Sequence, residues 1–149
     1  MKRLENWESK LFAFIESRKK TPMQWGTDDC FMLVVGAIKA MTGVDPKKAH
    51  PDARLIGSYD TPNEGYRTLR NYSGKGLVET CSMVANKMGM AVKDKAFASR
   101  GDVAIVETET VIGGVREVMG VVLGDVVASQ GKDGIVYNDI SKAKMIWTI

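Results

Sequence analysis

The spacing of apolar residues changes once along this chain, near Gly89. Before Gly89, apolar residues recur three and four positions apart, as on one face of a helix. After it they alternate with polar residues, as they do in half-buried strands. A block of helices followed by a block of strands is typical of the α+β class. We therefore expect N-terminal helices packed on a small C-terminal antiparallel sheet.

Two helices and a loop are expected before residue 61. The first helix spans residues 4–18, where apolar side chains have helical spacing. The second begins at Thr27 or Asp28, with acidic side chains in its first turn, and ends at Gly43. Residues 44–60 contain two prolines and are expected to form a loop.

The third helix has the clearest start signal in the chain. Thr61-Pro62-Asn63-Glu64 forms a capping box with proline at the first helical position. This helix is expected to break at Gly74. A fourth helix then runs from Leu77 to Met88, with apolar residues at core spacing.

The strand block is expected to form an antiparallel meander. Glycine pairs mark its turns, at Gly113-Gly114 and between Gly131 and Gly134; neither leads into a helix, so neither is a phosphate loop. The expected strands cover 101–107 with an extension to Ile112, then 115–123, 126–129, 135–140 and 144–149.

Composition excludes several classes of protein. With 149 residues, 44% of them hydrophobic and 26% charged, the chain is expected to fold as one domain over residues 1–149. An excess of 21 Lys and Arg over 18 Asp and Glu is too small and too dispersed for nucleic-acid binding. No apolar run reaches the ~20 residues that span a bilayer, and Glu5 and Glu8 lie where a signal peptide needs an apolar core. We therefore expect synthesis in the cytoplasm and neither a nucleic-acid nor a membrane partner.

Cysteine and histidine are scarce. The chain has Cys30, Cys81 and a single histidine, His50, so Cys and His alone cannot supply the four ligands of a structural zinc site. Neither cysteine belongs to a Cys-x-x-Cys pair, which argues against a thioredoxin-type redox role. We expect two free thiols rather than a disulfide, and neither a metal nor a cofactor.

Cys30 lies where a helix is expected to begin. Free backbone N–H groups and the helix dipole favour a thiolate there, which makes Cys30 a candidate nucleophile. Alternatively, Cys30 is a small buried residue on the core face, with Asp28 or Asp29 capping the helix. Residue chemistry alone favours the buried alternative, since free cysteine is among the most buried residue types.

The order of several short motifs resembles NlpC-type cell-wall peptidases, which have a papain-like fold. The layout is closer still to a phage and prophage family of NlpC-like proteins encoded among tail genes. The resemblance runs over nearly the whole chain, and its order carries more signal than any single motif. It rests on the Trp7 helix, Trp25–Cys30, Thr42-Gly43-Val44-Asp45, Tyr59, Gly101-Asp102-Val103, Gly120 and Trp147.

The resemblance implies a nucleophile at Cys30 and a histidine base on a strand, oriented by a further polar residue. The place of that histidine falls at about Val118, beside Met119-Gly120-Val121, and a second one is implied directly before Asp29-Cys30, where this chain has Asp28. Neither position holds a histidine. Asp102 belongs to a Gly-Asp pair that is a structural mark of the family.

Other candidate site residues have two interpretations each. His50 could fold back over the helix start as the base of Cys30, although a solvated loop histidine is the more common case. Trp25 either lines a peptide or sugar groove or packs between the first two helices. Asp29 is a candidate for substrate binding, but a cap or an arginine partner describes it better, because a carboxylate beside a thiol raises the thiol pKa.

Two functions follow from the resemblance. In the first, the chain is a phage tail protein of the tail tip or its assembly, which keeps the peptidase fold without a complete Cys–His pair and binds other tail proteins. In the second, it is a cysteine hydrolase that cuts peptidoglycan stem peptides during DNA entry. We favour the first, because the only histidine lies in the wrong place and a fold does not carry its function when the site is missing. The protein is then made in the host cytoplasm and ends in the virion tail.

Overall fold

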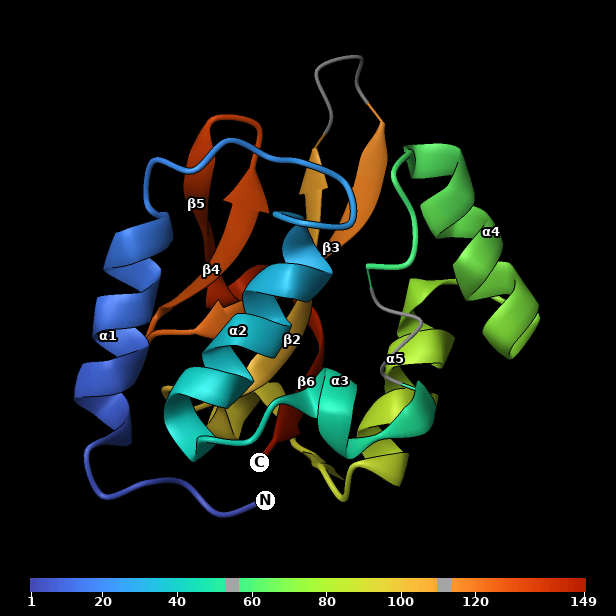
Figure 1. Cartoon of the computed structure of the whole chain (residues 1–149). Helices are drawn as coiled ribbons and strands as arrows, with labels where there is room; N and C mark the ends of the chain where they lie inside the picture. Colours follow the sequence, from blue (N-terminus) through green and yellow to red (C-terminus); the bar gives the residue numbers. More distant parts are fainter. Residues whose placement is uncertain (53–56, 110–113) are drawn as a thin grey trace.

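The structure is a computed structural model, and it describes residues 1–52, 57–109 and 114–149. Helices occupy the first part of the chain, as expected (Figure 1). Their bounds are α1 Trp7–Arg18, α2 Cys30–Thr42, α3 Pro46–Ala49, α4 Pro62–Ser73 and α5 Leu77–Lys87.

Strands fill the rest of the described chain, and all of their pairings are antiparallel. The α+β class is therefore confirmed. The strands are β1 Ala91–Val92, β2 Val103–Glu109, β3 Val115–Val122, β4 Val126–Gly131, β5 Gly134–Asp139 and β6 Ala143–Thr148. Two short 3-10 turns, η2 Lys95–Phe97 and η3 Ile140–Lys142, lie between them.

The strand order departs from a simple meander. The described strands form one sheet in the order β1-β6-β2-β3-β4-β5. Strands β2 to β5 follow one another as expected, but β6 returns across the sheet to pair with β2, and β1 pairs with its other edge. The expected extension of β2 to Ile112 and the turn at Gly113 lie outside the described residues.

Each face of the sheet packs against its own apolar cluster. On one face, α2 and the side chains of Met119, Val121 and Trp147 belong to the larger cluster. On the other face, Val118 and Val122 belong to a smaller cluster. Figure 1 shows α2 lying across the sheet, with α1 on one side of it and the α4–α5 pair on the other.

The expected helices are present, with small errors at their ends. Helix α2 begins at Cys30 rather than at Thr27 or Asp28, because Asp29 is its N-cap. Residues 44–60 are not all loop, since Asp45 caps the single turn of α3. The start signal of α4 at Thr61 is confirmed. The backbone N–H of Glu64 donates to Thr61 Oγ1 at 3.3 Å, and the Glu64 carboxylate accepts from the N–H of Asp60 at 2.9 Å, one residue before the cap. Gly74 ends the helix at φ +70°.

Asp102 lies fully buried just before β2, beside two basic side chains. Its carboxylate accepts hydrogen bonds from Lys93 Nζ at 2.9 Å and from the backbone N–H of Ser99 at 2.9 Å, and Arg3 lies 3.5 Å away. Burial by itself would raise the pKa of Asp102, but the bonds from Lys93 and Ser99 outweigh it and hold the pKa below 3.8. These contacts tie the N-terminal segment to the sheet. They give Asp102 a structural role.

Within the described ranges, no helix is both long enough and apolar enough to cross a bilayer.

Candidate functional site

A cleft of about 740 Å³ opens at the N-terminal end of α2. One wall is formed by the first part of β3, from Val115 to Val118, and the opposite wall by α4 and the turn that follows it. Cys30 and Asp29 lie between these walls, and Trp25, Tyr59 and Gln130 complete the lining. The structure therefore brings Trp25, Asp29 and Cys30, three of the residues singled out from the sequence, into one cavity.

The tight turn before α2 fixes the position of Cys30. The Asp29 carboxylate accepts two backbone N–H bonds, from Gly26 at 2.8 Å and from Met32 at 3.0 Å. Gly26 has φ +78°, and a Cβ at this position would lie 2.0 Å from the carbonyl oxygen of Tyr59. Only glycine fits such a position without strain. Asp29 is 1% exposed, so its role here is that of a helix cap.

Cys30 is the first residue of α2 and is half-buried. Removal from water is the main cause that raises the pKa of its thiol from 9.0 to about 11. The backbone N–H of Met119 would donate to a thiolate and lowers the pKa, while the Asp29 carboxylate raises it. The helix start was expected to favour a thiolate. In the structure burial is the larger effect, so the thiol is protonated at neutral pH.

Four aromatic rings line the cleft beside Cys30, those of Trp25, Phe31, Tyr59 and Tyr66. The Trp25 ring lies 6.2 Å from the ring of Tyr59 and 6.2 Å from that of Tyr66, measured between centroids, and both pairs are tilted. Burial, followed by the nearby Asp29 carboxylate, raises the pKa of Tyr59 well above its usual value. Trp25 thus lines the cavity, and the ring contacts that hold it are with Tyr59 and with Tyr66 of α4 rather than with the first two helices.

The position expected for the base is apolar. Val118 does line the cleft, but it is 7% exposed and belongs to the cluster on the far face of the sheet. On β3 the side chains that share a face with α2 are those of Val121, Met119 and, by alternation, Glu117. No side chain on this strand is an imidazole.

The structure does not bring His50 to Cys30. His50 directly follows α3, beyond the C-terminal end of α2, and Cys30 is at the other end of that helix (Figure 1). A helix of 13 residues is about 20 Å long. His50 instead accepts a bond from the backbone N–H of Asp52 at 3.4 Å, and Asp52 pairs with Lys87 at 2.7 Å.

Polar residues that were not predicted from the sequence also reach the cleft. Glu107 and Glu117 face each other across β2 and β3, and Lys144 pairs with both, at 3.2 Å and 2.5 Å. Gln130, which is 3% exposed, donates from Nε2 to the carbonyl oxygen of Thr21 at 2.8 Å, and its Oε1 has no partner among the described residues. These residues come together through strand pairing, which cannot be read from the sequence.

Arg70, Lys75 and Arg116 line the same cleft. Arg70 lies in the last turn of α4, Lys75 in the turn after it, and Arg116 on β3. None of the three pairs with an acid among the described residues, whereas the cleft acids are already engaged. Counting Lys144, four basic side chains stand against the three carboxylates of Asp29, Glu107 and Glu117, so the net charge at the cleft is positive.

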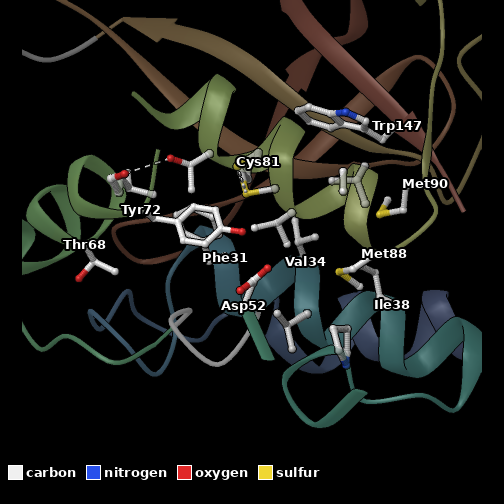
Figure 2. Close-up of a pocket in the computed structure, with 18 of the residues that line it drawn as sticks. Phe31, Val34, Ile38, Asp52, Thr68, Tyr72, Cys81, Met88, Met90 and Trp147 are labelled. Carbon is white, nitrogen blue, oxygen red and sulfur yellow. Dashed lines mark hydrogen bonds between the residues drawn. The ribbon is translucent and has the colours of Figure 1, made fainter. Parts of the chain in front are cut away.

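The second cysteine occupies a separate, apolar cavity. Cys81 is 5% exposed, and burial raises its pKa well above the usual value. The cavity has a volume of about 70 Å³ and lies between α2, the α4–α5 pair and the sheet. Figure 2 shows Cys81, Met88, Met90 and Trp147 around it. Cys81 is thus an inert thiol and serves as an internal reference for Cys30.

Across residues 1–52, 57–109 and 114–149, no three His, Cys, Asp or Glu side chains are grouped so that they could hold a metal ion. The cleft offers a ligand a neutral thiol, aromatic rings, the cations of Arg70, Lys75 and Arg116, and the polar side chains of Glu107, Glu117 and Gln130.

Comparison with known proteins identifies a family. No curated protein and no solved structure matches the chain. A family model described as a domain of unknown function, DUF6950, matches residues 2–149, almost the entire chain. The chain therefore belongs to the DUF6950 family.

Proposed function

We propose that this chain is a phage tail protein, acting at the tail tip or in its assembly, whose papain-like, NlpC-type fold lacks a working Cys–His pair. The observation that carries the proposal is the state of Cys30. It lies at a helix start and opens onto a large cleft, as a nucleophile would, yet its thiol is protonated and no described histidine lines that cleft.

Nucleophilic catalysis by cysteine needs a base within about 3 Å of the thiol, and the only histidine of the chain lies beyond the far end of α2. The carboxylates of the cleft are poor substitutes. Asp29 is engaged by two backbone N–H groups, and Glu107 and Glu117 are paired with Lys144. A cleft of this kind supports binding rather than bond cleavage. Its partners in the proposal are other tail proteins.

The test is a Cys30→Ala substitution in the phage or prophage that encodes the chain, with Cys81→Ala as the matched control. If Cys30 only packs, particle yield, tail length and infectivity of Cys30→Ala equal those of the parent. Normal particles that fail to infect would contradict the proposal, because such a result means that the thiol acts after assembly.

A second function is favoured by one observation, the opening of Cys30 onto a cleft wide enough for a peptide. This is the cysteine hydrolase that cuts peptidoglycan stem peptides. Incubating the purified protein with peptidoglycan and measuring released amines separates the two functions. Release that Cys30→Ala abolishes establishes the hydrolase, and no release from parent or variant supports the tail protein.

A further inference from the structure

No described strand pairs with one edge of the first half of β3. Strands β3 and β4 pair only from Gly120↔Ser129 to Val122↔Val127, whereas β2 pairs with β3 along its whole length, from Val121 back to Val115. Among the described residues, β3 is therefore paired on the β2 side alone from residue 115 to 119. The other edge of residues 115–118 lines the cleft, while the N–H of Met119 faces Cys30.

The hydrogen bonds further along β3 show which backbone groups face that edge. The N–H of Val122 donates to the carbonyl oxygen of Asp102, the residue just before β2, at 2.8 Å. The N–H of Leu123 donates to the carbonyl oxygen of Val126 on β4, also at 2.8 Å. Directions alternate along an antiparallel strand, so odd-numbered residues face the β4 side. The N–H and C=O groups of Val115 and Glu117 therefore point into the cleft, where no described strand meets them.

Unpaired N–H and C=O groups in a row form a template for an added strand. Recognition by strand addition takes its affinity from main-chain bonds, and its specificity from the side chains beside the edge. The side chains beside this edge include aromatic and basic ones, and the carboxylates there, Glu107 and Glu117, are paired with Lys144. Trp25 and Tyr66 form an apolar wall, and Arg70, Lys75 and Arg116 supply cations that have no acidic partner among the described residues. Figure 1 shows the β2–β3 hairpin rising beside α4, which carries Tyr66 and Arg70.

We propose that this cleft binds an extended, acidic segment of a partner protein, which adds as a strand to the 115–118 edge of β3. Carboxylates of the segment pair with Arg70, Lys75 and Arg116, and its apolar residues lie against Trp25 and Tyr66. This inference rests on the proposed function, because it assigns a binding partner to a cleft that performs no catalysis.

The probe is the labelled peptide fluorescein-(Val-Glu)4-amide, with fluorescein-(Val-Lys)4-amide as its matched control, and binding to the full chain is measured by fluorescence anisotropy. The acidic peptide is expected to bind at least tenfold more tightly, and 1 M NaCl is expected to remove that preference, since salt screens exposed charges. The triple variant Arg70→Gln, Lys75→Gln, Arg116→Gln loses the preference, and Lys10→Glu on α1 keeps it. Equal binding of the two peptides would overturn the proposal.

Amide exchange reads the edge directly, without a variant. In the free protein the amides of Val115 and Glu117 exchange at least tenfold faster than those of Arg116 and Val118, which face β2. Saturating acidic peptide is expected to protect Val115 and Glu117. Binding that leaves these two amides unprotected would show that the peptide does not add as a strand, and would overturn the proposal.

A backbone variant tests the same edge. Val115→Pro removes a donor that faces the cleft and leaves the β2 ladder intact, so affinity falls by about fivefold or more, the worth of one hydrogen bond. Val115→Ala keeps the donor and keeps the affinity. Circular dichroism confirms that both variants fold, and a variant with unchanged affinity after loss of the donor contradicts the inference.

Different results would refute the two proposals. Release of amines from peptidoglycan would refute the proposed function and would leave the amide exchange rates expected for β3 unchanged. A soluble stem tetrapeptide that displaces the acidic peptide at equal concentration would show that the cleft takes peptidoglycan, and would overturn the protein-segment inference.

Discussion

Replacing Asp29 with alanine tests the account of how the site is built. The buried carboxylate holds the N–H groups of Gly26 and Met32 at 2.8 and 3.0 Å. Losing an N-cap costs about 1 kcal/mol, and leaving the Gly26 N–H without an acceptor adds about 1–3 kcal/mol. The Asp29→Ala variant should therefore lose about 2–4 kcal/mol of unfolding free energy, which for 149 residues corresponds to a fall in Tm of about 5–15 °C.

The assay is unfolding in urea, monitored by circular dichroism. An unchanged slope m indicates that the substitution changed only the stability. Asp94→Ala is the matched control. Asp94 also accepts a backbone N–H bond, from Ala96 at 2.8 Å, but Asp94 is exposed. In Asp94→Ala, water can therefore take the place of the lost carboxylate, and the free energy of unfolding falls by no more than about 0.5 kcal/mol. An Asp29→Ala variant no less stable than Asp94→Ala would refute the reasoning.

Two further predictions concern the turn and the buried carboxylate. Gly26→Ala adds a Cβ 2.0 Å from a carbonyl oxygen at φ +78°, and should lose about 2–5 kcal/mol in thermal unfolding. At Gly74, which has φ +70°, an added Cβ would have no atom within 4 Å, so Gly74→Ala should lose only about 1–2 kcal/mol of unfolding free energy. Equal losses in the two variants would contradict a clash at Gly26. Because the pKa of Asp102 is lowered by folding, its stabilisation is full above its ordinary pKa of 3.8 and is lost as pH falls below that value. In the Asp102→Asn variant, the free energy of unfolding should therefore depend less on pH below about pH 4 than it does in the parent. The same pH dependence in both proteins below about pH 4 would contradict this role of Asp102.

Local signals in the sequence predicted most of the fold. The start signal at Thr61, the stop at Gly43 and the change of period near Gly89 each depend on a few neighbouring residues, and all three are confirmed. The return of β6 to pair with β2 was missed, because strand order is decided by contacts between distant segments. The short helix α3 was missed because its signal is a single turn after Asp45.

The candidate site was predicted in part, for a similar reason. Cys30, Asp29 and Trp25 are close in sequence, and their grouping follows from one turn and one helix start. The cations opposite them come from α4 and β3, and only the tertiary fold brings those elements together. For Cys30 the sequence left two alternatives, a thiolate favoured by the free N–H groups and dipole of the helix start, and a small buried residue, of which residue chemistry favoured the second. Burial outweighs the effect of the helix start and raises the pKa of the Cys30 thiol to about 11.

The pH dependence of Cys30 alkylation tests the central claim most directly, with Cys81 as the internal reference and mass spectrometry as the readout. A cleft that keeps the nucleophile's place without activating it predicts that Cys30 reacts slowly at pH 7. Its rate should then rise toward pH 11, in line with its raised pKa. A Cys30 that reaches half of its maximal rate well below the free-thiol pKa of ~8.5 would contradict the claim, since such a thiol is activated for catalysis.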